Sequence, residues 1–120
     1  MKKLFIILLF SISSLFAFEH LNADNFDEKI SKKNVIIDFY ATWWYACKTL
    51  GKSLTKYDAS KNQDVTIYKV DIENQEKLAN RFNIRSIPAL VYIKNGKIIS
   101  KEVGVRSQEE IKSNVNKYFN

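Results

Sequence analysis

Two short runs of β-branched and aromatic residues constrain the fold of this chain more than any other feature. Residues 35–41 (VIIDFYA) and residues 65–70 (VTIYKV) are apolar over most of their length, at consecutive positions as well as alternate ones. Strands of this kind are buried on both faces, as happens when helices cover both sides of a sheet. The two runs are therefore predicted to be inner strands of an α/β sheet.

Segments with helical patterns separate and follow these runs. The first helix is expected to be capped by Asp24 or Asn25, because a short polar side chain can accept a hydrogen bond from the first turn. Phe26 and Ile30 should face inward from that helix. The last helix is expected to begin with the capping box that Ser107 and Glu110 form. Helices are predicted at about residues 25–32, 47–61, 75–82 and 107–119.

A hairpin signal closes the pattern. Asn95-Gly96 lies between residues 89–94 (ALVYIK) and residues 97–103 (KIISKEV), and Asn-Gly between two strand-like runs favours a tight turn. The predicted order is helix, strand, helix, strand, helix, strand, strand, helix. This order predicts an α/β three-layer sandwich, with a central mixed β-sheet flanked by helices.

Residues 1–17 have the pattern of a secretory signal peptide, with two lysines, an apolar run at 4–10 and a cleavage site after Ala17. The alternative is an uncleaved inner-membrane anchor. Residues 4–18 are shorter than the ~20 apolar residues that a spanning helix needs, so the signal peptide is the preferred prediction. Residues 18–120 then form one exported domain, in a compartment where disulfides persist.

Charge and composition point away from several classes of function. The formal net charge is +6, but the lysines are scattered along the sequence and no Arg-rich run occurs, so no nucleic-acid partner is expected. Cys47 is the only cysteine, which rules out an internal disulfide. His20 is the only histidine, so we expect neither a Cys–His catalytic pair nor a metal site, and no cofactor.

Four separated segments resemble one family when they are taken together. The resemblance needs no insertion or deletion from about residue 36 to residue 104 and identifies the chain with the thioredoxin family, which implies a thioredoxin-like fold. The segments are residues 38–43 (DFYATW) followed by Cys47-Lys48, then Lys69-Val70-Asp71, then residues 82–90 (FNIRSIPAL), and last Lys94-Asn95-Gly96 with Gly104 beyond it.

The pair Ala46-Cys47 differs from the Gly-Pro-Cys ending of cytoplasmic thioredoxins. It is more similar to exported thiol–disulfide interchange proteins, including the C-terminal domain of the periplasmic membrane-spanning reductase. The resemblance therefore implies a periplasmic protein that acts on protein or peptide thiols and disulfides. It also suggests a membrane disulfide reductase as a partner, and we expect a monomer.

Family members exchange disulfides with two thiols, one at the exposed start of a helix and one three residues later. By resemblance, Trp44 occupies the attacking position and Cys47 the resolving one. Tryptophan has no thiol chemistry, and Cys47 is expected to be sheltered, with a raised pKa. The two-thiol cycle is therefore expected to be disabled in this chain.

The other site residues that the resemblance implies are still present. Asp38 would relay protons to Cys47 with Lys69 nearby, although an ion pair without a function is an equal alternative. Pro88 would be a cis-proline, rather than an ordinary proline at the start of a strand. Trp43 would flank the site, with simple packing as the alternative. The substrate-binding residues would be Trp43, Tyr45, Ala46, Ile87 and Pro88.

Three interpretations of Trp44 remain open. In the first, a single base change, natural or engineered, or a sequence error put tryptophan in place of cysteine in a thiol–disulfide oxidoreductase. In the second, the chain is a redox-inactive module that binds peptides or proteins through Trp43, Trp44, Tyr45 and the Pro88 edge. In the third, Cys47 becomes exposed and works alone as a single thiol.

Overall fold

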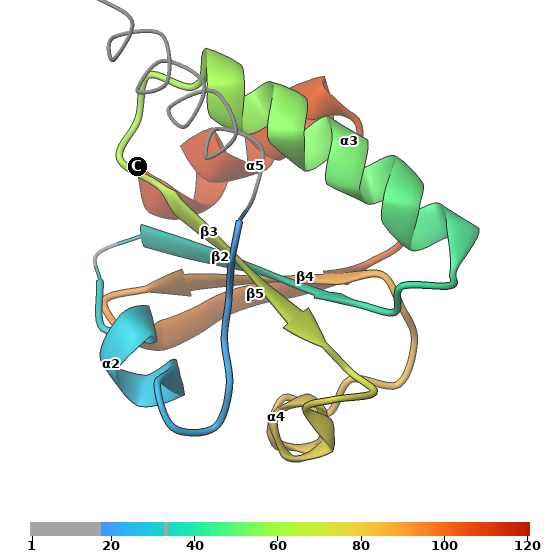
Figure 1. Cartoon of the computed structure of the whole chain (residues 1–120). Helices are drawn as coiled ribbons and strands as arrows, with labels where there is room; N and C mark the ends of the chain where they lie inside the picture. Colours follow the sequence, from blue (N-terminus) through green and yellow to red (C-terminus); the bar gives the residue numbers. More distant parts are fainter. Residues whose placement is uncertain (1–17, 33) are drawn as a thin grey trace, which may run out of the picture.

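The computed structural model describes residues 18–32 and 34–120, so the predicted signal peptide and its membrane-anchor alternative lie outside it. Within the described residues, no helix is both long and apolar enough to cross a membrane. The strands form one sheet in the order β1-β3-β2-β4-β5 (Figure 1). They are β1 (Glu19–His20), β2 (Asn34–Tyr40), β3 (Thr66–Asp71), β4 (Ala89–Lys94) and β5 (Lys97–Val103). The helices are α2 (Phe26–Ile30), α3 (Tyr45–Ser60), α4 (Glu76–Arg81) and α5 (Gln108–Phe119).

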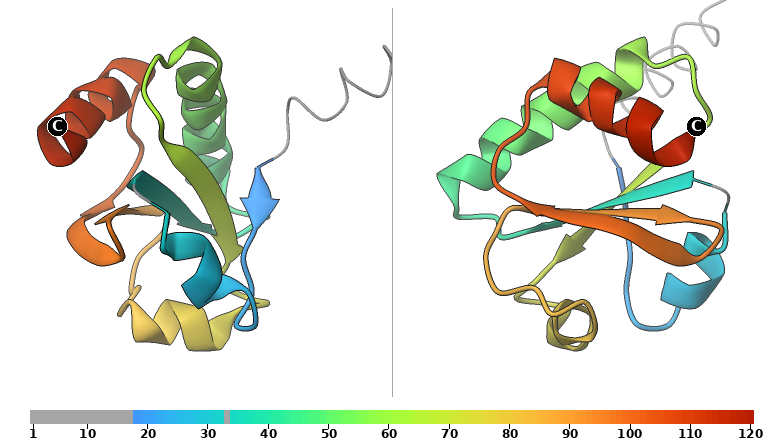
Figure 2. Two further views of the ribbon diagram at one scale, coloured as in Figure 1. Left: turned by 90° about the vertical axis from the view of Figure 1, so that its left-hand side faces the viewer. Right: turned by 180° about the vertical axis from the view of Figure 1, so that it is seen from behind.

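The sheet is mixed, as predicted. β3 pairs in parallel with both β1 and β2, whereas β4 is antiparallel to both β2 and β5. Helices α3 and α5 cover one face of the sheet, and α2 and α4 lie against the other (Figures 1 and 2). The predicted three-layer arrangement is therefore confirmed.

The residues of β2 explain why its sequence is apolar at consecutive positions. Val35, Ile37 and Phe39 belong to the apolar cluster between the sheet and helices α2 and α4. Ile36 belongs to a second cluster, on the opposite face, with Leu50 of α3. All five side chains are fully buried. Both faces of the strand are thus covered, so positions 35–40 suit apolar side chains with the exception of Asp38.

The predicted hairpin joins β4 to β5. Asn95 and Gly96 both have positive φ, 52° and 79°, as a tight turn between twisted strands requires. Glu102 on β5 then accepts hydrogen bonds from Asn114 Nδ2 at 2.9 Å and from the Tyr118 hydroxyl at 2.6 Å, both on α5. These bonds hold the outermost strand against α5.

The two predicted helix caps have different outcomes. Ser107 Oγ accepts from the Glu110 N–H at 3.1 Å and the Glu110 carboxylate accepts from the Ser107 N–H at 3.0 Å, so the capping box is confirmed. The expectation that Asp24 or Asn25 caps α2 through its side chain is wrong. Asn25 is the N-cap residue, but its Oδ1 accepts from the N–H of Asn22, outside the helix. Phe26 and Ile30 are buried as expected.

Two further elements differ from prediction. Helix α3 was expected to begin at Cys47. It begins two residues earlier, at Tyr45. Strand β1 was not predicted at all, because its two residues are exposed and carry no apolar pattern. It exists through backbone pairing with β3, in which Glu19 lies opposite Tyr68.

Candidate functional site

The loop between β2 and α3 places Trp44 and Cys47 in one helical turn. Trp44 is the N-cap residue of α3, and its carbonyl oxygen accepts from the N–H of Cys47 at 3.1 Å and of Lys48 at 3.4 Å. No side chain caps this end of the helix. The N–H groups of Tyr45 and Ala46, in the first turn, are therefore left to solvent or a ligand, with Trp44 beside them.

Three consecutive aromatic side chains are exposed at this end of the molecule. Trp43 is 64 % exposed, Trp44 45 % and Tyr45 80 %. The Trp43 and Trp44 rings meet edge to face, with their centroids 5.8 Å apart, and Trp43 Nε1 donates to a carboxylate oxygen of Glu73 at 2.8 Å. Trp43 is thus a surface residue, and ordinary half-buried packing does not describe it. Ala46 behind these rings is half-buried.

Cys47 is sheltered, as predicted. Its side chain is only 2 % exposed. Burial raises the pKa of the thiol, and the nearby Asp38 carboxylate raises it further. The backbone of Ala41 and the Lys69 ammonium group lower the pKa in part. The thiol is therefore protonated at neutral pH and a poor nucleophile.

Asp38 is a fully buried carboxyl group beneath this thiol's helix. No protein group in the described part of the chain donates a hydrogen bond to either of its carboxyl oxygens. Lys69 Nζ lies 3.7 Å from Asp38 Oδ2 and 4.2 Å from the centroid of the Tyr40 ring. Burial raises the pKa of Asp38 to about 6, and Lys69 opposes this rise. The structure thus brings together Asp38, Lys69 and Cys47, the three residues expected to share a proton-relay site.

Ile87 and Pro88 lie at the same end of the sheet as this loop. The peptide bond between them is cis, which confirms the expectation drawn from the family. Because Phe39 pairs with Ala89, the residues just before β4 lie beside those just after β2. Pro88 is buried and Ile87 is half-buried. The Pro88 carbonyl accepts from the N–H of Gly104 at 2.9 Å.

A groove of about 790 Å³ beside α3 was not anticipated from the sequence. Lys48, Lys52 and Lys56 line it from α3, Lys69 lines it from β3, and Cys47 forms part of its wall. The prediction that the lysines are scattered is therefore wrong here, because four-residue spacing puts three of them on one helical face. That spacing was visible in the sequence. The remaining lining residues are Phe18, His20, Gly51 and Thr55.

Comparison with known proteins assigns the chain to a family. The family model described as Thioredoxin matches residues 17–117. The chain belongs to the thioredoxin family. It is 34 % identical over 92 residues to thioredoxin from Mycoplasmoides gallisepticum, covering 76 % of this chain and 91 % of that one. It is 33 % identical over 98 residues to thioredoxin from Chlamydia trachomatis, covering 82 % and 95 %.

The mitochondrial relatives are longer than this thioredoxin-family chain. Mouse mitochondrial thioredoxin is 31 % identical over 101 residues, which is 82 % of this chain but 61 % of the mouse protein. Among solved structures, a thioredoxin mutant from Halobacterium salinarum superposes with a TM-score of 0.78 at 22 % identity, covering 88 % of this chain and 93 % of that one. That likeness confirms the thioredoxin fold.

Thioredoxins are oxidoreductases that act on protein disulfides. Residues 18–32 and 34–120 contain no group of three or more His, Cys, Asp or Glu that could hold a metal ion. Cys47 is the only cysteine of this thioredoxin-family chain.

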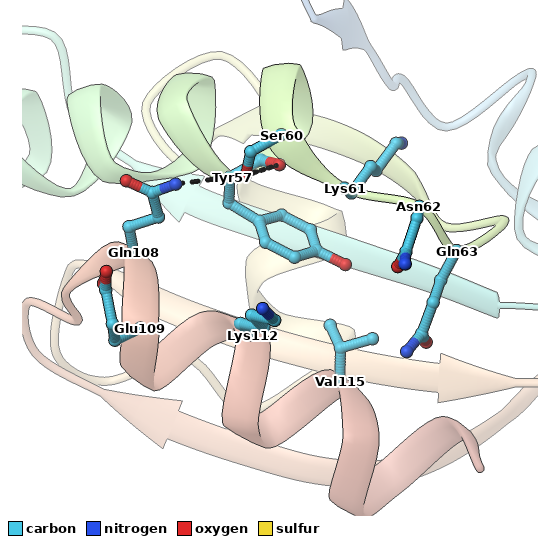
Figure 3. Close-up of a pocket in the computed structure, with 9 residues that line it drawn as sticks. All are labelled: Tyr57, Ser60, Lys61, Asn62, Gln63, Gln108, Glu109, Lys112 and Val115. Atoms are coloured by element: carbon cyan, nitrogen blue, oxygen red, sulfur yellow. Dashed lines mark hydrogen bonds between the residues drawn. The ribbon is translucent and has the colours of Figure 1, made fainter.

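A second, smaller cavity lies away from the predicted site residues. It has a volume of about 250 Å³ and lies between the C-terminal end of α3 and α5 (Figure 3). The Tyr57 ring lies between the two helices, and its buried hydroxyl has no partner in the described part of the protein. Gln108 Nε2 donates to Ser60 Oγ at 3.0 Å across the cavity rim. None of the predicted site residues lines it.

Proposed function

We propose that this chain is an exported protein of the thiol–disulfide interchange type, with a two-thiol cycle that is disabled because Trp44 occupies the attacking position. The observation that carries the proposal is the start of α3. Unpaired N–H groups at a helix N-terminus favour a thiolate there, and this chain has an indole side chain at that place.

The cycle needs two thiols for electron balance. A thiolate attacks one sulfur of a substrate disulfide, the S–S bond breaks, and the substrate thiolate that leaves takes up a proton. A second thiolate then attacks the mixed disulfide, so that the substrate is reduced and the protein holds an internal disulfide. Cys47 alone cannot form that internal disulfide, so catalytic turnover is blocked.

The residues around Cys47 support a scaffold that otherwise suits interchange. Asp38 and Lys69 are kept together although a buried carboxyl group is costly. In an interchange protein, Asp38 would accept the proton that Cys47 loses. The single-thiol interpretation has less support, because the Cys47 side chain is only 2 % exposed and its thiol has a raised pKa.

Export is the second part of the proposal, and the pattern of residues 1–17 supports it. The periplasm would supply protein disulfides as substrates and a membrane disulfide reductase as the electron donor. Intact-mass analysis of the protein from a periplasmic extract tests this. We expect a chain that begins at Phe18. A chain that begins at Met1 and remains with the membrane would favour the anchor.

A redox-inactive peptide-binding module is the second candidate, and one observation favours it. Trp43, Trp44 and Tyr45 form a contiguous exposed aromatic surface, which is a common composition for a binding site. Such a module would hold an extended peptide against the rings and the Pro88 edge without exchanging a disulfide.

A disulfide-reduction assay with dithiothreitol as electron donor distinguishes these functions. The protein is assayed beside Trp44→Cys and beside Trp44→Cys with Cys47→Ser. We expect turnover only from Trp44→Cys, which restores the pair of thiols. Turnover by the chain without substitution would show that Cys47 works alone and would overturn the proposal. No turnover from any variant, with native circular dichroism, would favour the binding module.

A further inference from the structure

The lysine-lined groove beside α3 has a one-sided charge. Its charged lining residues are Lys48, Lys52, Lys56 and Lys69, and among residues 18–32 and 34–120 no carboxylate lines it. Lys69 faces the buried Asp38, which lies behind the groove wall. His20 and the Cys47 thiol, which also line the groove, add no negative charge at neutral pH. The groove therefore attracts anions and repels cations.

The three lysines on α3 are available for a partner. Within residues 18–32 and 34–120, none of Lys48, Lys52 and Lys56 takes part in an ion pair. Lys48, Lys52 and Lys56 are exposed. The neighbouring acid Asp58 is paired with Lys61 at 2.7 Å and does not neutralise the row.

The spacing of the row favours an extended peptide. Residues four apart on a helix lie about 6 Å apart along its axis, because each residue rises about 1.5 Å. Alternate side chains of an extended peptide lie about 6.6 Å apart on one side. Acidic residues at every second position of such a peptide would therefore meet Lys48, Lys52 and Lys56 in turn.

The walls between these charges suit the remainder of a peptide. Phe18, Gly51 and the aliphatic parts of the lysines give the groove apolar surface beneath the ammonium groups. We propose that this groove docks an extended acidic segment of a partner protein, with alternate carboxylates paired to Lys48, Lys52 and Lys56. None of the aromatic residues Trp43, Trp44 and Tyr45 lines the groove. Of the proposed disulfide site, only Cys47 and Lys69 line the groove, and the three α3 lysines that carry the docking proposal have no role in the disulfide exchange.

Fluorescence anisotropy tests this with a labelled peptide of alternating glutamate and serine. We expect saturable binding that weakens as salt rises, and no binding of the matching lysine–serine peptide. The triple variant Lys48→Gln, Lys52→Gln and Lys56→Gln should weaken binding at least about tenfold. The control is Lys77→Gln, Lys112→Gln and Lys117→Gln, which changes the net charge equally on α4 and α5 and should bind like the unsubstituted protein.

Two results would overturn the proposal. One is equal weakening by the groove variant and the control variant, which would mean general attraction to a basic protein. The other is tighter binding of single-stranded nucleic acid or of anionic vesicles than of the peptide, again dependent on the groove lysines. Amide NMR supplies a second readout, since bound peptide should shift the signals of Gly51 and Thr55.

Discussion

Asp38 is a carboxyl group in an otherwise apolar part of β2, and its side chain is fully buried. Burial raises the pKa of its carboxyl group from 3.8 to about 6, even with Lys69 3.7 Å away. The folded protein therefore binds this proton more tightly than the unfolded chain does. Linkage then requires the contribution of Asp38 to the free energy of unfolding to fall as the pH rises from 3.8 to about 6. Above that range the contribution stays constant.

We predict that Asp38→Asn stabilises the protein at neutral pH. The free energy of unfolding should rise by about 2–3 kcal/mol at about pH 7.5 and by much less at about pH 4, where the carboxyl group is already neutral. Lys69 is partly exposed and can be hydrated after its partner is lost. Urea unfolding at both pH values measures this. Asp24→Asn, at an exposed acid, is the control, and an equal gain at both pH values would contradict the assignment.

We predict that Cys47 reacts slowly while the protein is folded. Its buried thiol should be alkylated by iodoacetamide at least about tenfold more slowly in the native protein than in guanidinium chloride at the same pH, because the thiolate is the reacting form. Mass spectrometry of quenched samples gives both rates. Equal rates would show that the thiol is open to solvent and would support the single-thiol interpretation.

At the scale of elements, α3 contains one weak point. Gly51 lies in the middle of the helix, where glycine lowers stability relative to alanine. Thr55 Oγ1 donates to the Gly51 carbonyl at 2.9 Å, within the same stretch. A Cβ at position 51 would lie 3.7 Å from Lys69 Nζ, an ordinary contact distance. Helix α3 therefore has room for an alanine methyl group at position 51.

We predict that Gly51→Ala raises the free energy of unfolding by about 0.5–1 kcal/mol. For a domain of this size, the melting temperature should rise by roughly 3–6 °C. Gly104→Ala is the contrasting variant, because Gly104 has φ of 107° and alanine would be strained there. Thermal unfolding followed by circular dichroism compares them. A loss of stability in Gly51→Ala would mean that the methyl group disturbs Lys69.

The elements show what local sequence can predict. The central strands, the Asn95-Gly96 turn and the Ser107 capping box depend on residues close together in the chain, and all were predicted. β1 depends instead on a distant strand, and its two exposed residues gave no local signal. The cap of α2 was mispredicted because the Asn25 side chain accepts from the Asn22 N–H at 2.8 Å, a local turn contact that competes with capping.

At the scale of the whole molecule, the site was predicted in part. The proximity of Asp38 to Lys69 and the sheltered position of Cys47 were both implied by the family resemblance, and the structure has both. The groove could not be predicted, because its lining includes His20 of β1 and the preceding Phe18, and β1 gave no signal in the sequence. Helical spacing alone could have suggested the lysine row.

We predict that the protein is a monomer. β5 is one of the two edge strands of the sheet, with Ile98 and Ile99 exposed, and such an edge can pair with another copy. Lys97 and Lys101 on the same strand, with a net charge of +6, oppose that pairing. Light scattering across a range of protein concentrations tests this. A mass that doubles as the protein concentration rises would contradict the monomer. If Lys97→Ile doubles more readily than the unsubstituted protein, β5 would be identified as the pairing edge.

The two exposed tryptophans next to α3 also decide what optical experiments on this protein report. Trp43 and Trp44 are its only indoles, and neither lies in an apolar cluster. Intrinsic fluorescence therefore follows events at the candidate site, such as a peptide settling on the rings, without any label. Unfolding of the apolar core, which does not contain these rings, need not change the tryptophan emission. A fluorescence titration can thus measure ligand binding, while unfolding needs a separate probe of backbone structure.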